Sequence, residues 1–147
     1  MKLSGQKFRF SADRADELLY GSGLVPSGAT VMGLLSSVAV ATKIAKAAKR
    51  CHLGVRNTDK AAVLLAGMKA VKPVLVLIDW DECEREAFQL LQTLRQDESL
   101  KRLPVMGYVS NNKADLKGMA ERAGCDRVYF KTDFLNHLED VIARCAL

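Results

Sequence analysis

The sequence lacks the features that several common functional classes require. No apolar run approaches the roughly 20 residues of a membrane-spanning helix. Residues 1–11 alternate polar and apolar side chains, without the apolar centre of a signal peptide. The four cysteines form no Cys-x-x-Cys pair and have only two histidines as possible imidazole partners, which argues against a zinc site. We therefore expect a cytoplasmic chain without a membrane anchor, whose thiols stay reduced and serve as small apolar residues.

Glycine and aromatic residues are missing where ligand sites would need them. The hydroxyl-rich stretch Ser36–Thr42 contains no glycine, which a phosphate cradle needs for its converging N–H groups, so flavin mononucleotide binding is not expected. The net charge of +5 is small, and no stacking aromatics accompany the basic residues. Four basic residues lie at helical spacing after the first predicted strand, namely Lys43, Lys46, Lys49 and Arg50. We expect them to form a solvated helix face, or to bind an acidic partner, in preference to nucleic acid.

The length and composition indicate one compact domain with a short appendage. The chain has 147 residues, of which 49% are hydrophobic and 27% charged. Residues 1–29 form an N-terminal arm with an alternating strand pattern at Lys7–Ser11, a short helical pattern over Ala12–Tyr20 and a linker of Gly, Ser and Pro. This arm is too short to build a core, so we expect it to dock on the main domain or on a partner.

From Thr30 onward, short aliphatic runs alternate with helical patterns. Five strands and five helices in strict alternation predict an α/β fold with a doubly wound parallel sheet. The flavodoxin-like strand order 2-1-3-4-5 is the commonest solution at this size. The predicted strands are Thr30–Leu35, Leu53–Asn57, Val74–Asp79, Pro104–Tyr108 and Arg127–Phe130. The predicted helices are Val38–His52, a helix capped by Thr58 and running to Ala70, Glu82–Gln96, Lys113–Ala123 and Asp133–Cys145.

The third predicted strand passes abruptly from aliphatic to acidic residues. Five consecutive aliphatic residues lead into Asp79, with Asp81 two positions later. In the predicted strand order the first and third strands are central, and the loops after them face each other at the carboxyl edge of the sheet. The pattern therefore brings Ser36, Ser37, Asp79 and Asp81 together. The other acids of the run, including Glu84 and Glu86, fall in the first turns of a helix, where the helix dipole favours carboxylates.

These residues resemble a receiver domain of the response-regulator family. Leu75–Trp80 is similar to the third strand of that family and its phospho-accepting aspartate, here Asp79. Leu103–Tyr108 is similar to the fourth strand, Ala123–Asp126 to the alanine-glycine-alanine-aspartate turn, and Lys131 to the lysine after the fifth strand. The resemblance covers about residues 30–147 and implies a receiver-like fold and a role in two-component signalling.

The chain departs from this family at the phosphorylation site. The acidic pair that would hold Mg²⁺ after the first strand is replaced by Ser36 and Ser37, so Asp79 and Asp81 would be the only carboxylates for the metal. The hydroxyl residue that contacts the phosphoryl group falls at Val109, with Ser110 one residue later and pointing elsewhere. The switch aromatic falls at Val128, with Tyr129 on the opposite face of the strand, and the proline after the lysine is Thr132.

These departures favour a pseudo-receiver that works as a phosphorylation-independent signalling or protein-interaction module. We expect no enzymatic activity and no cofactor, and we expect Asp79 to be a vestigial phospho-acceptor in a standing ion pair with Lys131. The partner would be a protein, or a second copy bound through the arm or through the faces of Lys113–Ala123, Arg127–Phe130 and Asp133–Cys145. Two alternatives stay open: a genuine receiver that accepts phosphate on Asp79, and a small-ligand binder at the same edge.

Overall fold

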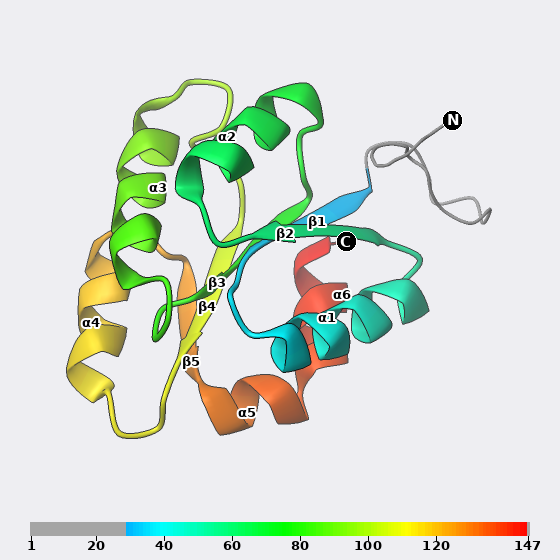
Figure 1. Ribbon diagram of the computed structural model, residues 1–147, viewed down its shortest axis with the longest axis vertical. Coiled ribbons are helices and arrows are strands. Elements are labelled where there is room, and N and C mark those ends of the chain that lie inside the picture. The colour runs from blue at the N-terminus through cyan, green and yellow to red at the C-terminus, as the bar shows by residue number, and fades with distance from the viewer. Residues whose placement is uncertain (1–28, 147) are drawn as a thin grey trace.

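The computed structural model describes residues 29–146, so the predicted N-terminal arm lies outside the described residues except for Ala29. Strands and helices alternate along this part of the chain, with two helices at the end (Figure 1). The strands are β1 (Thr30–Leu34), β2 (Gly54–Thr58), β3 (Leu75–Asp79), β4 (Val105–Val109) and β5 (Arg127–Phe130). The helices are α1 (Val38–Arg50), α2 (Ala61–Ala70), α3 (Glu84–Gln96), α4 (Ala114–Arg122), α5 (Lys131–Asn136) and α6 (Leu138–Ala146).

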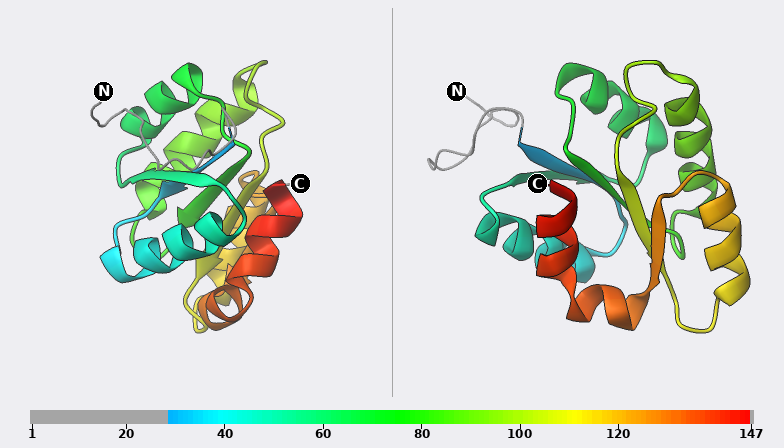
Figure 2. Two further views of the ribbon diagram at one scale, coloured as in Figure 1. Left: turned by 90° about the vertical axis from the view of Figure 1, so that its right-hand side faces the viewer. Right: turned by 180° about the vertical axis from the view of Figure 1, so that it is seen from behind.

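The strands form one parallel sheet in the order β2-β1-β3-β4-β5, which confirms the predicted topology. Helices α2, α3 and α4 cover one face of the sheet, and α1, α5 and α6 cover the other (Figures 1 and 2). This three-layer arrangement places β1 and β3 at the centre. Their carboxyl ends, and the loops that follow them, lie side by side at one edge of the sheet, as the sequence predicts.

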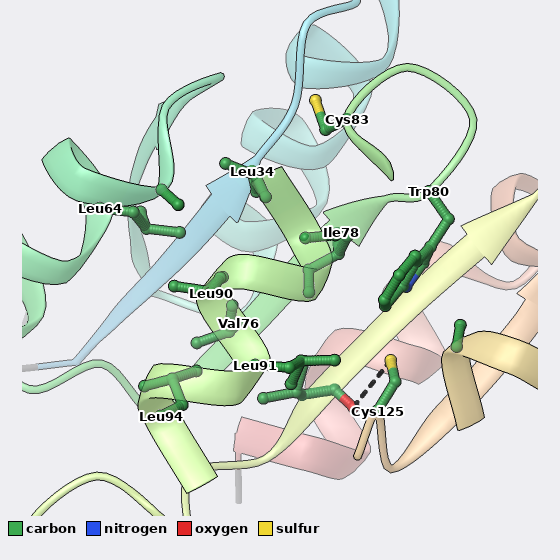
Figure 3. Close-up of a cluster of buried hydrophobic side chains, with 14 of the residues drawn as sticks. Leu34, Leu64, Val76, Ile78, Trp80, Cys83, Leu90, Leu91, Leu94 and Cys125 are labelled. Atoms are coloured by element: carbon green, nitrogen blue, oxygen red, sulfur yellow. Dashed lines mark hydrogen bonds between the residues drawn. The ribbon is translucent and has the colours of Figure 1, made fainter. Parts of the chain in front are cut away.

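The core is split by the sheet into two apolar clusters. Every residue of β3 is buried, and its side chains alternate between the clusters because successive strand residues point to opposite faces. Val76 and Ile78 join the cluster beneath α2, α3 and α4 (Figure 3), whereas Leu75 and Leu77 join the cluster beneath α1, α5 and α6. This burial on both faces explains why β3 reads as an uninterrupted aliphatic run.

Trp80 fills the space just beyond β3. Its side chain is fully buried and meets Phe88 edge to face, with ring centroids 4.9 Å apart. A Cβ atom at Gly107 in β4 would lie 2.6 Å from the indole atoms Cδ1 and Nε1, so only glycine allows the indole to lie this close to β4. Burial also raises the pKa of the neighbouring Cys125 thiol to about 12, and this thiol donates to the Val105 carbonyl (Figure 3).

The loops at the amino end of the sheet are held by one arginine. Arg95, near the end of α3, donates to the carbonyl oxygens of Lys101 at 2.8 Å, Leu103 at 3.0 Å and Gly124 at 2.6 Å. It also pairs with Asp126, whose carboxylate accepts the N–H of Val105 at 2.8 Å. A single half-buried guanidinium therefore joins α3 to the segments that enter β4 and β5.

Most predicted helix ends shift by one or two residues in the structure, and two helices differ more clearly from the sequence prediction. Thr58 does not cap α2, because it is the last residue of β2 and the helix begins three residues later. The first N–H of α2, at Ala61, is instead accepted by Glu86 of α3 at 2.6 Å. The helix predicted over Asp133–Cys145 is two helices, α5 and α6, because His137 adopts a non-helical backbone conformation between them. Both differences come from contacts or turns that hydrophobic periodicity does not report.

Candidate functional site

Asp79 closes β3 and holds the loop that follows. Its side chain is only 2% exposed, and its Oδ1 atom accepts the backbone N–H groups of Asp81 at 3.0 Å and Glu82 at 3.1 Å. Tyr108 lies beside Asp79 in β4. Its hydroxyl is buried without a hydrogen bond of good geometry, and burial together with the Asp79 charge raises the pKa of Tyr108 well above its ordinary value. Asp79 therefore has a structural role whether or not it has a chemical one.

Asp81 joins the loop after β3 to the loop after β4. Its carboxylate accepts the backbone N–H of Ser110 at 3.0 Å and the Ser110 hydroxyl at 2.5 Å, and Lys113 Nζ lies 3.6 Å away. Burial acts to raise the pKa of Asp81, but the two hydrogen bonds from Ser110 and the charge of Lys113 outweigh burial, so the pKa falls below its ordinary value. Asp81 is therefore ionised and already bonded at neutral pH.

The loop after β4 is held from its other side as well. The side-chain oxygen of Asn111 accepts from both the backbone N–H and the hydroxyl of Thr132, each at 3.3 Å. Thr132 lies in the first turn of α5, at the position where the family resemblance implies proline. The loop of residues 110–113 therefore bonds to the loop after β3 on one side and to α5 on the other.

The serines after β1 do not supply a charged site. Ser37 caps α1, with its hydroxyl oxygen accepting the N–H of Val40 at 3.2 Å, while Ser36 is exposed. Cys83 is buried near the same edge. Burial, with a smaller contribution from the Asp79 charge, raises the pKa of its thiol to about 11, which keeps the thiol protonated at neutral pH. Neither the hydroxyls nor the thiol adds negative charge to that of Asp79 and Asp81.

The residues at this edge do not fit a magnesium ion. Among residues 29–146, no group of three or more Asp, Glu, His and Cys side chains could hold a metal ion. Mg²⁺ requires near-octahedral oxygen ligands and favours carboxylates that are free to coordinate it. Here Asp79 Oδ1 already accepts two amides, and both Asp81 oxygens accept from Ser110. The same limitation affects Asp79 as an acceptor of phosphate, since the incoming negative charge would not be screened.

The predicted ion pair between Asp79 and Lys131 is wrong. No such pair occurs in the part of the chain that the structure describes. Lys131 is half-buried and is itself the first residue of α5, because the helix starts directly after β5. The lysine that does pair with an acid at this edge is Lys113, which lies beside Asp81 instead of Asp79.

The two positions where the family resemblance implies switch residues are part of the core. Val109 and Val128 are buried in the cluster beneath α2, α3 and α4. Tyr129 lies on the other face of the sheet, 6.0 Å from the Phe134 ring, as the strand alternation predicts. No hydroxyl or mobile aromatic ring occupies either position. Ser110 bonds to Asp81 and not to Asp79.

Sequence reasoning brought Ser36, Ser37, Asp79 and Asp81 to one edge, but it missed the partners of Asp81. Ser110 and Lys113 come from the loop after the neighbouring strand, 29 and 32 residues from Asp81. The sequence shows a serine and a lysine in the loop after the fourth strand. It does not show that they bind Asp81, because the same residues are common in exposed loops.

Comparison with known proteins gives the fold. Neither a protein-family model nor a curated protein sequence matches the chain. A response regulator from Hahella chejuensis superposes with a TM-score of 0.71 at 18% identity, over 80% of this chain and 94% of that chain. The chain has the receiver fold. A response regulator from Thermotoga maritima superposes with a TM-score of 0.67 at 19% identity, over 80% of this chain and 97% of that one.

The Francisella response regulator 1452 receiver domain also shares the fold. It superposes with a TM-score of 0.66 at 15% identity, over 80% of this chain and 96% of that chain. At identities of 15–19% these superpositions show a shared architecture, and they carry no information about a shared activity. In addition, none of the helices in residues 29–146 has the length and apolar content needed to cross a bilayer.

Proposed function

We propose that this chain is a non-catalytic, receiver-like module of two-component signalling that works through protein contacts without being phosphorylated. One observation supports this proposal above the others: Asp81 binds the Ser110 hydroxyl and the Lys113 ammonium. The family resemblance implies that a hydroxyl near the end of the fourth strand contacts the phosphoryl group. Here the hydroxyl of Ser110, one residue after β4, donates to the carboxylate of Asp81, so the loop after β4 has an anion bound to it in the resting protein.

The proposed contact surface lies over α4, β5, α5 and α6. Met119 on α4 is 43% exposed, and the Lys117 ammonium lies 5.8 Å from the centre of the Phe130 ring. An exposed methionine, and separately a cation over an aromatic ring, are features that suit contact with a protein partner, and a second copy of this chain would be one such partner. Because the loop of residues 110–113 leads directly into α4, the bonds made by Asp81 would hold this surface in one arrangement.

The proposal is tested by attempting phosphorylation and by rebuilding the missing charges. With acetyl phosphate and Mg²⁺, the natural chain should show no phosphoryl mass gain, and beryllofluoride should leave its NMR spectrum unchanged. A Ser36→Asp/Ser37→Asp variant restores two carboxylates beside Asp79 and should bind Mg²⁺. The matched Ser36→Asn/Ser37→Asn variant, of similar size but neutral, should not.

Phosphorylation of the natural chain would favour the alternative function. A mass gain that disappears in Asp79→Asn would show that Asp79 accepts phosphate with the residues present, and the chain would then be an ordinary receiver. A beryllofluoride effect in the natural chain that also disappears in Asp79→Asn would lead to the same conclusion. Either result would refute phosphorylation independence.

A further inference from the structure

Helix α2 is apolar around almost its whole circumference. On the inner side it buries Ala61, Leu64 and Met68 in the core. The outer side is exposed and is also apolar, apart from Lys69 near the end of the helix. We call this exposed set the α2 apolar face; it consists of Ala62, Val63, Ala66 and Ala70. A helix that is apolar on all sides is normally covered on all sides, so this composition calls for a contact partner.

The other long helices show what an uncovered surface looks like in this protein. The exposed side of α1 carries Lys43, Lys46, Lys49 and Arg50 along its length, and its exposed valine, Val38, is the first residue of the helix. The exposed side of α3 carries Gln89, Gln92, Thr93 and Gln96. Both sets interact well with water. Val63, by contrast, is 59% exposed, and beyond Lys60 at the N-cap its neighbours in the α2 apolar face are alanines without charge.

The described chain begins close to the α2 apolar face. The carbonyl oxygen of Thr30 accepts the N–H of Val74 at 2.9 Å. Val74 follows the last residue of α2, Ala70, by four residues, so the end of α2 lies within on the order of 15 Å of Thr30. The helix has ten residues and is itself about 15 Å long. A segment that precedes Ala29 therefore enters the domain next to the end of α2.

The residues before Ala29 have the composition that this face would bind. They include large apolar side chains, which cannot form a core within 28 residues. Three of these, Leu18, Leu19 and Tyr20, are followed by the eight-residue linker Gly21–Gly28, which can span up to about 28 Å. With the two residues that follow the linker, Tyr20 can lie up to about 35 Å from Thr30, which covers the distance from Thr30 to any residue of α2.

We propose that residues 1–28 bind the α2 apolar face of the same chain, with Leu18, Leu19 and Tyr20 supplying the apolar contact. This binding would cover α2 and leave α4, β5, α5 and α6 open for the partner. It is independent of the proposed signalling function, because it involves neither Asp79 nor the loop after β4.

The test uses NMR of the full chain with substitutions on each side of the proposed contact. A Leu18→Asp/Leu19→Asp variant should shift the amide resonances of Ala62, Val63, Ala66 and Ala70 and leave that of Ala45 on α1 unchanged. In the reciprocal experiment, Val63→Glu should shift the resonances of Leu18, Leu19 and Tyr20. The matched control is Val38→Glu, because Val38 is an 80% exposed valine near the start of α1 on the other side of the sheet.

Dilution of the natural chain separates the possible occupants. Binding within one chain predicts spectra that do not change with protein concentration. Shifts of the α2 resonances on dilution would show that a second copy covers the face, and the proposal would be wrong. It would also be wrong if Leu18→Asp/Leu19→Asp left α2 unchanged, or if it shifted only residues of the edge strand β2, such as Asn57. None of these outcomes depends on phosphorylation of Asp79.

Discussion

The two ends of the sheet use charged side chains in opposite ways. At the amino end, the Arg95 guanidinium donates to the carbonyl oxygens of Lys101, Leu103 and Gly124. At the carboxyl end, Asp79 and Asp81 accept backbone N–H groups from the loops. Both arrangements satisfy loop backbone that the sheet and helices leave unpaired. The carboxyl end is where this fold places its chemistry, so carboxylates used for structure there are no longer available as metal ligands.

Two Asp–Ser pairs show that the role of the same hydrogen bonds depends on where in the fold they form. Asp81 accepts the N–H and hydroxyl of Ser110, and Asp97 accepts the N–H and hydroxyl of Ser99. The first pair joins two loops 29 residues apart, and the Asp81 side chain is 10% exposed. The second pair spans two residues in a turn at the amino end of the sheet. The same chemistry is a tertiary contact in one place and a local turn in the other.

The largest loss of stability is expected from removing the hydrogen bonds of Arg95 at the amino end of the sheet. Arg95→Met should lower the free energy of unfolding by about 2–4 kcal/mol, because it leaves several half-buried carbonyl groups without a donor. Urea unfolding followed by circular dichroism measures this change. Arg85→Met is the matched control, since Arg85 is an exposed arginine on the same helix. Equal losses in the two variants would show that the hydrogen bonds of Arg95 do not carry the effect.

The carboxyl end should be the next most sensitive. Asp81→Ala removes the acceptor of two Ser110 groups and should lower the free energy of unfolding by about 1–3 kcal/mol. Asp97→Ala should cost less, because water can replace the carboxylate in an exposed turn. The comparison is made by urea unfolding at neutral pH. If Asp97→Ala costs as much as Asp81→Ala, the link between the two loops contributes nothing beyond a local turn.

The contribution of Asp81 should also depend on pH. Its pKa is lowered from the ordinary value in the folded protein, so the ionised carboxylate favours the folded state. This stabilisation is fully present above about pH 5 and is lost as the pH falls through the folded-state pKa. The difference in unfolding free energy between the natural chain and Asp81→Asn should therefore shrink as the pH falls through the folded-state pKa of Asp81. A difference that stays constant over this range would show that the Asp81 charge is not involved.

The smallest effect is expected at the amino end, from relief of backbone strain. His52, two residues after the end of α1, has a positive φ of 61°, in the left-handed region that favours glycine. His52→Gly should raise the free energy of unfolding by about 0.5–1 kcal/mol in thermal denaturation. Gly124, with φ of 115°, provides the opposite test: Gly124→Ala should destabilise the protein. A loss of stability in His52→Gly would mean that the histidine side chain makes a contribution larger than the strain.

Much of the fold could be predicted from local patterns. Arg127–Phe130 was predicted with its observed bounds, and Val74–Asp79 differs from β3 by one residue. Both strands are short runs rich in apolar residues, and in β3 burial on both faces requires such a run. The separation of α5 from α6 at His137 was not predictable, because the apolar spacing continues through the break.

The sequence predicted where the candidate site lies but not which hydrogen bonds and ion pairs its residues form. Strand order alone brought Ser36 and Ser37 to the same edge as Asp79 and Asp81, since the carboxyl ends of parallel strands meet there. The bond from Ser110 to Asp81, and the absence of the expected pair between Asp79 and Lys131 in residues 29–146, depend on where each loop leaves its strand. Helix α5 starts at Lys131 itself, and no periodicity in the sequence indicates that start.

The sequence by itself determined the layers of this protein. Apolar periodicity of two or 3.6 residues is a local property, and it decides which face of each strand and helix must leave water. The tertiary structure alone decided which donor each carboxylate accepts, as in the contact of Glu86 with Ala61 of α2. A hydrogen bond needs its partners within about 3 Å and well aligned, and only the placement of whole loops supplies that geometry.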